Sequence, residues 1–119
     1  GSNSNLSNDY PIFRYADIML VSAEAKFRQG KIAEATEIVN QIRARAEVAP
    51  FVNMTLENIY DERGREMFAE ATRRTDQIRF GKFNEAWWEK AVSQPFRNIF
   101  PIPQDQINAN PNLVQNPGY

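Results

Sequence analysis

The sequence contains no cysteine and no histidine. The first absence excludes disulfide bonds and cysteine nucleophiles, and the two together exclude thiolate and imidazole metal sites and any Ser-His-Asp triad. No Asp-x-Asp-x-Asp-Gly segment that would indicate a calcium loop is present either. We therefore expect neither a bound metal nor a cofactor.

The sequence also lacks an excess of charge of one sign and any long apolar run. Fourteen Lys and Arg residues oppose 15 Asp and Glu residues, which gives a net charge of -1. Nucleic acid is not an expected partner, because neutralising phosphates needs a clustered basic excess. No stretch approaches the ~20 apolar residues that a membrane-spanning helix needs.

The 119 residues present have the length of one domain or part of one, and 42% of them are apolar. Residues 1–10 are polar and begin with Gly-Ser, the remnant that a tag-cleaving protease leaves, so we expect a tag and linker there. Apolar residues at helical spacing follow from residue 11 onward and predict an all-α fold.

Residues 11–48 predict two helices joined by a tight turn. Apolar side chains recur at steps of three and four over residues 12–27, and Gly30 is positioned to end this helix in a left-handed cap. The same spacing continues over residues 32–46, and Pro50 stops the second helix. The two helices are expected to form an antiparallel hairpin.

The small residues of this hairpin follow the spacing of a tetratricopeptide repeat. Ala23 lies seven residues before Gly30, and Ala35 lies five residues after it. Such repeats bury their faces against neighbouring copies and usually need about three. Because one clear copy is present, we expect the chain to be a piece of a larger domain, and its uncovered face to favour a dimer of the fragment.

Further helices are predicted over residues 55–92, and an extended tail over residues 93–119. Thr55 is a suitable N-cap for a third helix, which the apolar pattern extends, with a bend, to Gly81. A shorter helix is predicted over residues 84–92. Four of the seven prolines fall in the last 19 residues, and a proline disfavours helix in the residue before it.

Residues 61–79 are the most highly charged segment, with five acids and five arginines. Equal numbers of opposite charges at helical spacing favour a structural ion-pair network. A catalytic carboxylate would instead stand apart from cations, so that its pKa is raised. The alternative is a small carboxylate-dependent hydrolase that uses Glu66. The predicted network comprises Asp17, Glu24, Arg43, Arg45, Glu62, Glu66, Glu70, Arg73, Asp76 and Arg79. Its two acids from the first helix could pair locally with Arg14 and Arg28, but we expect them to meet Arg43 or Arg45 of the second helix.

Trp87 and Trp88 are the weak candidates for a ligand-binding site. Aromatic side chains stack on sugar rings, so a glycan contact is one interpretation. Adjacent helical residues point about 100° apart, so one tryptophan would be buried and the other partly exposed or covered by a region outside this chain. Core packing or a domain contact is the interpretation we favour.

Three groups of segments, in this order, resemble the C-terminal portion of the SusD/RagB family. They lie in residues 14–25 (RYADIML and AEA), residues 38–81 (IVNQIRARA, ERGREMFAE and DQIRFG) and residues 100–119 (FPIP, NPNL and QNPGY). The resemblance covers residues 11–119, and the final NPGY resembles the natural C-terminus of a family member. It assigns no ligand-binding residue within this chain.

The resemblance implies a role in nutrient capture. The family comprises outer-membrane lipoproteins of Bacteroidetes that bind glycans or other nutrients at the cell surface and pass them to a SusC-like, TonB-dependent transporter. Its members are not enzymes, and their lipidated N-terminal cysteine would lie outside this chain. The chain is then expected to serve mainly as scaffold and partner surface. The alternative is a stand-alone tetratricopeptide-like module that binds a peptide.

Overall fold

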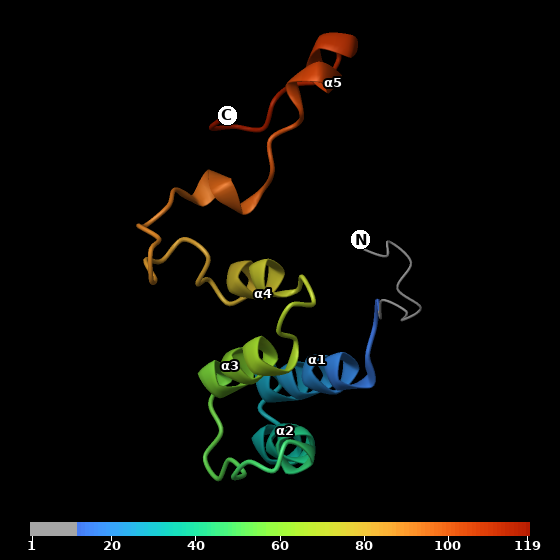
Figure 1. Ribbon diagram of the computed structural model, residues 1–119, viewed down its shortest axis with the longest axis vertical. Helices are drawn as coiled ribbons and strands as arrows, with labels where there is room; N and C mark the ends of the chain where they lie inside the picture. Colours follow the sequence, from blue (N-terminus) through green and yellow to red (C-terminus); the bar gives the residue numbers. More distant parts are fainter. Residues whose placement is uncertain (1–11) are drawn as a thin grey trace, which may run out of the picture. The chain divides into compact units, whose positions relative to one another are not determined.

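The computed structural model describes residues 12–119 and is helical (Figure 1). The expected tag and linker at residues 1–10 lie outside the described residues. Among the described residues the only β-type pairing is an isolated bridge between Trp87 and Lys90, so the prediction of an all-α fold is confirmed. The chain divides into two compact units, Gly1–Ala71 and Thr72–Tyr119.

The first unit is built on the hairpin of α1 (Tyr15–Arg28) and α2 (Ile32–Arg45). Gly30 adopts a positive φ of 80°. Its amide donates to the Phe27 carbonyl, and the Lys31 amide donates to the Lys26 carbonyl. This pair of bonds is the Schellman motif, which satisfies the last carbonyls of a helix and reverses the chain.

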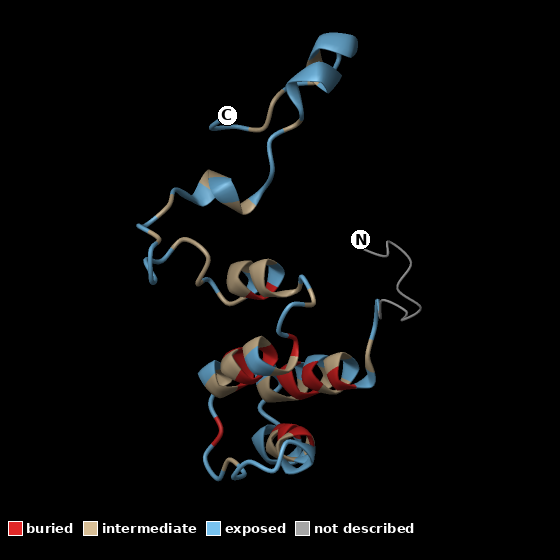
Figure 2. Cartoon of the chain, viewed as in Figure 1, coloured by how far each residue is buried: buried red, intermediate tan, exposed pale blue. Residues whose placement is uncertain are grey.

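Small and branched residues form the core between the helices of the first unit. Leu20 and Ala23 of α1, Ala35 and Val39 of α2, and Ile59 of the third helix are each 0% exposed. The two alanines allow close approach of the hairpin's helices, as their repeat-like spacing predicted. Figure 2 shows most of the buried positions on α1, α2 and α3.

The third helix, α3 (Leu56–Glu66), begins as the sequence indicated. The Thr55 side chain accepts from the Asn58 amide, and the Asn58 side chain accepts from the Thr55 amide, forming a reciprocal capping box. The predicted bent continuation to Gly81 is wrong. Ala69 and Ala71 both have positive φ angles, which interrupt the helix.

The second unit contains α4 (Arg73–Arg79), the 3-10 helix η1 (Pro95–Asn98) and α5 (Gln104–Ala109). The helix predicted over residues 84–92 is absent. The Asn84 carbonyl instead accepts from the Ser93 amide at 3.0 Å, and the Asn84 side chain bonds to Ser93 and Asn98. These contacts join residues nine and fourteen positions apart and close a loop in place of the predicted helix.

Side-chain amides organise the last twenty residues of the chain. Gln115 accepts from the Ile102 amide at 2.8 Å and donates to the Ile102 carbonyl at 2.9 Å. Asn116 donates to the Phe100 carbonyl at 2.7 Å. The Tyr119 ring meets the Phe96 ring edge-on, with centroids 5.0 Å apart. These contacts fold residues 115–119 back onto η1 and the residues that follow it.

Candidate functional site

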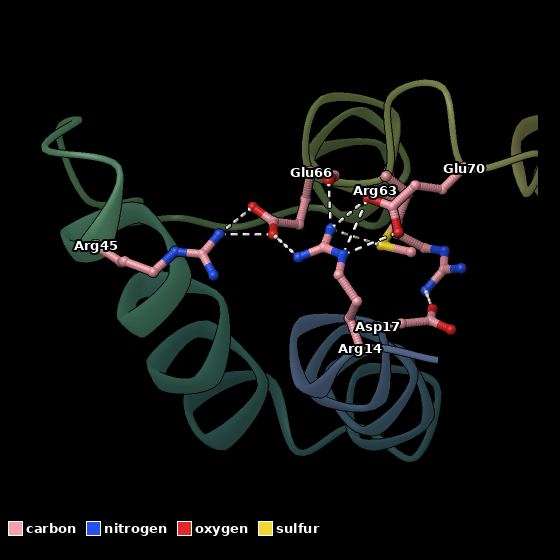
Figure 3. Close-up of polar contacts among 7 residues, drawn as sticks. Arg14, Asp17, Arg45, Arg63, Glu66 and Glu70 are labelled. Atoms are coloured by element: carbon pink, nitrogen blue, oxygen red, sulfur yellow. Dashed lines mark hydrogen bonds and ion pairs between the residues drawn. The ribbon is translucent and has the colours of Figure 1, made fainter. Parts of the chain in front are cut away.

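Arg14 is the centre of the largest polar cluster in the first unit (Figure 3). It is extended and immediately precedes α1. Its Nε and Nη2 donate to the two carboxylate oxygens of Glu70 at 2.9 and 2.7 Å. Its Nη1 donates to the Glu66 carboxylate at 3.0 Å, and Nη2 also donates to the Glu66 carbonyl at 2.8 Å. One guanidinium thus binds two carboxylates and the end of α3, which is the planar geometry that arginine favours.

Glu66 is shared between two arginines from different parts of the hairpin. Arg45, at the end of α2, donates to its two carboxylate oxygens at 2.6 and 2.7 Å. Burial alone would raise the pKa of Glu66, but the hydrogen bonds from Arg45 and Arg14 outweigh it, and the pKa is lowered. The hydrogen bonds that Arg14 donates to Glu70 and Glu66 raise the pKa of Arg14 in turn. Both groups therefore stay charged in the folded protein.

Two acids of α1 have partners that differ from those expected on α2. Asp17 pairs with Arg63 of α3 at 3.0 Å, and the Arg63 side chain is only 5% exposed. Glu24 pairs with Arg28 on its own helix at 2.9 Å. The expectation that Asp17 meets an arginine of α2 is wrong, because α3 packs on α1 and presents Arg63 there.

The other residues of the predicted network do not form one cluster. One group joins α3 to α2 around Glu62, and another lies within α4. Arg43 of α2 and Arg65 of α3 both bind the buried Glu62 carboxylate, at 2.7 and 2.8 Å. In the second unit, Asp76 pairs with Arg79 at 2.8 Å within α4. Arg73 is the first residue of α4. Glu70 lies beyond the end of α3 at Glu66, where it binds Arg14.

This arrangement of charges is suited to holding helices together. Glu62, Glu66, Glu70 and Asp17 each lie within 3.0 Å of an arginine nitrogen. A general acid needs a raised pKa at neutral pH, whereas the pKa of Glu66 is lowered. In the part of the chain that the structure describes, no group of three or more acids is placed to hold a metal ion.

Sequence reasoning missed Arg14 as the centre of the network. Its partners Glu66 and Glu70 are 52 and 56 residues away, and helical spacing rules reach only three or four residues. The sequence feature that could have drawn attention to Arg14 is its position as the first residue of the first segment that resembles the SusD/RagB family.

The two tryptophans lie on a tight turn rather than on a helix. Trp87 is 41% exposed and Trp88 is 85% exposed, so the expectation that one of them is buried is wrong. The Trp87 ring lies 6.3 Å from the Phe83 ring and 4.1 Å from the Lys90 ammonium. The Trp88 ring is the more accessible aromatic surface.

A shallow groove of about 750 Å³ runs along α2. Ile32, Thr36, Asn40 and Ala44 line it, and Val52 of the following loop borders it. The groove is open to solvent and contains no cluster of catalytic side chains.

An α-hairpin with tetratricopeptide-like spacing, joined to a third helix by ion pairs, places the chain among all-α proteins with a tetratricopeptide-like fold. A sequence profile described as the SusD family matches residues 1–96 and 88–119. The chain belongs to the SusD family, as the sequence motifs indicated.

Relatives and solved structures of this family are similar to the chain over most of its length. The Starch-binding protein SusD of Bacteroides thetaiotaomicron is 39% identical over 122 residues, covering 93% of this chain and 22% of the relative. The SusD-like protein P38 of Formosa agariphila is 36% identical, covering 91% and 24%. Surface glycan-binding protein A from Bacteroides uniformis superimposes with a TM-score of 0.80 at 28% identity, covering 92% and 28%.

The chain therefore spans about a quarter of the length of these proteins. None of the described helices is both long and apolar enough to cross a membrane.

Proposed function

We propose that the chain is the C-terminal helical part of a surface lipoprotein that binds glycans or other nutrients and delivers them to a TonB-dependent outer-membrane transporter. Membership of the SusD family supports this proposal, as do the words starch-binding and glycan-binding in the names of similar proteins. The lipid anchor and the cell-surface location would be properties of the longer protein.

Within that protein, this segment acts as scaffold and partner surface and not as an enzyme. The observation that carries this assignment is the pairing of the α3 carboxylates with arginines of the hairpin. Paired carboxylates fix the position of α3, whereas a carboxylate with a lowered pKa does not donate protons near neutral pH.

Calorimetric titration of the chain against a panel of oligosaccharides tests the scaffold role. We expect no micromolar binding. Micromolar binding that is lost in Trp87→Ala or Trp88→Ala would overturn the assignment and make this segment the principal ligand site. Affinity capture from solubilised outer membranes tests the partner, with recovery of a TonB-dependent transporter as the expected result.

The groove along α2 favours a second candidate, a module that binds a peptide. Its lining combines apolar side chains such as Ile32 and Val52 with polar ones such as Asn40 and Gln41, a mixture that an amphipathic peptide helix could contact. This hypothesis predicts capture of a soluble peptide-bearing partner in place of the transporter, and loss of that capture when Ala44→Glu places a charge in the groove.

A further inference from the structure

The chain between α3 and α4 has a composition that favours helix. Residues 67–72 read MFAEAT, contain neither glycine nor proline, and include four residues that are alanine, methionine or glutamate. These three types are among the strongest helix formers. The structure nevertheless ends α3 at Glu66 and begins α4 only at Arg73. The break therefore opposes the local preference of the sequence.

The break is made by two alanines in left-handed backbone. Ala69 has a φ of 64° and Ala71 a φ of 59°. In this conformation a Cβ atom lies too close to the following carbonyl oxygen, a strain that glycine avoids. Strained residues of this kind persist where the surrounding structure over-determines them. The residue between the two alanines is Glu70, and its side chain is held by Arg14.

Arg14 makes the contacts that oppose continuation of α3. Its Nε and Nη2 donate to the two carboxylate oxygens of Glu70 at 2.9 and 2.7 Å. Nη2 also donates to the Glu66 carbonyl at 2.8 Å (Figure 3). In an uninterrupted α-helix that carbonyl would accept from the amide of residue 70, which donates instead to the Met67 carbonyl at 3.1 Å. One guanidinium therefore occupies the acceptor that the next helical turn needs.

We propose that Arg14 is the helix stop of α3, and that residues 67–72 adopt a second, helical conformation when Arg14 leaves Glu66 and Glu70. Release makes the Glu66 carbonyl available to the Glu70 amide and relieves the strain at both alanines. Such a segment is a two-state element, because the ion pair favours one conformation and the backbone favours the other. The first compact unit ends within this segment, at residue 71, so the change alters the backbone that connects the two units.

NMR of the whole chain tests the proposal, because Cα shifts and the NOE between the amide and Hα protons of one residue distinguish left-handed from helical backbone. In Arg14→Gln, both alanines should move from left-handed to helical values. The exchange of the Glu70 amide should slow several-fold relative to that of the buried Ile59. Arg65→Gln, the matched change at another arginine that binds an α3 carboxylate, should leave both alanines left-handed.

Two further variants distinguish a helix stop from a general loss of structure. Adding Ala69→Gly and Ala71→Gly to Arg14→Gln should restore left-handed backbone at both positions, because glycine adopts positive φ without strain and disfavours helix. Glu70→Ala removes one of the two carboxylates and should shift the alanines in the same direction by a smaller amount. This milder variant decides the question if Arg14→Gln does not fold.

Two outcomes would overturn the proposal. Alanines that stay left-handed in every folded variant of this contact would show that the break does not depend on Arg14. Random-coil shifts over residues 67–72, in place of helical ones, would make the contact a simple tie with no second conformation. Neither outcome bears on the proposed nutrient-binding function, which capture of the transporter decides separately.

Discussion

Arg14 shows how one side chain can hold together elements that are far apart in sequence. It binds Glu66 and Glu70 while only 27% of its side chain is exposed. Lysine carries the same charge but lacks the planar donors that reach two carboxylates and a carbonyl together. The position therefore requires arginine.

Arg14→Lys should lower the free energy of unfolding by about 2–3 kcal/mol, because the charge-assisted bonds to partly buried carboxylates are lost. Urea unfolding followed by circular dichroism measures this change. Arg65→Lys is the matched control and should cost less than about 1 kcal/mol, since this side chain is 57% exposed and Arg43 continues to neutralise Glu62. Equal losses in the two variants would contradict the central role of Arg14.

Glu66 should make the stability of the first unit depend on pH. Its folded-state pKa is lowered below the unfolded value of about 4.3. Its contribution is then present above the unfolded pKa and lost as pH falls through the folded pKa.

Glu66→Gln should be less stable than the unaltered chain by about 2 kcal/mol at pH 7, and the difference should shrink as pH falls below about 4. Unfolding curves recorded from pH 7 to pH 3 check this. Glu37→Gln, at an exposed position of α2, should follow the unaltered chain throughout. A difference between Glu66→Gln and the unaltered chain that stays constant with pH would contradict a lowered pKa for Glu66.

At the scale of elements, α2 ends in a Schellman motif built on a residue other than glycine. The Glu47 amide donates to the Ala44 carbonyl and the Val48 amide to the Arg43 carbonyl, as in the glycine turn after α1. Glu47 has a φ of 55°, a conformation that costs residues with a Cβ atom roughly 1–2 kcal/mol.

Glu47→Gly should therefore stabilise the chain by about 1 kcal/mol, seen as a higher urea midpoint with unchanged slope. Gly30→Ala is the reverse control. A Cβ atom there meets nothing within 4 Å, so its expected loss of about 1 kcal/mol reflects backbone strain alone. If Glu47→Gly destabilised the chain, the interactions of the glutamate side chain would contribute more to stability than the strain of its left-handed backbone costs.

The elements that the sequence predicted well are those with periodic apolar residues and local caps. The helices that became α1 and α2, and the Thr55 start of α3, follow from such signals. The break after α3 could not be predicted from such signals, because Ala69 and Ala71 are residues that favour helix and yet adopt positive φ angles. The turn at residues 87–90 was missed because Asn84 makes hydrogen bonds that depend on Ser93 and Asn98.

The candidate site was less predictable than the fold. The sequence showed which acids and arginines are present and predicted that they form an ion-pair network. The partners of Asp17 and Glu70, however, depend on how α3 lies against the hairpin. Pairings across 52 or 56 residues are set by packing, which local spacing does not reveal.

At the scale of the whole molecule, burial is unevenly divided between the two units. Among the residues that the structure describes, every buried apolar one lies between Ala16 and Met67, and none after Asp76 is buried. The second unit is held mainly by side-chain amides and aromatic contacts such as those of Gln115 and Tyr119.

Native-state hydrogen exchange should therefore be slowest for amides of α1, α2 and α3, including Leu20, Val39 and Ile59. Hydrogen-bonded amides after residue 80 should exchange at least about 100-fold faster, because they open without exposing a buried core. Mass spectrometry of peptides from the exchanged chain measures both sets. Uniform protection along the chain would mean that the second unit opens only with the first.

The contact between Arg14 and Glu70 also joins the two ends of the three-helix segment. Residue 14 leads into α1 and residue 70 lies just beyond α3, so the guanidinium brings the entry and exit of this unit to one point. A unit whose two ends meet can be inserted into a host loop without separating the loop's ends. The ion pair between Arg14 and Glu70 thus brings the two ends of the three-helix segment close together.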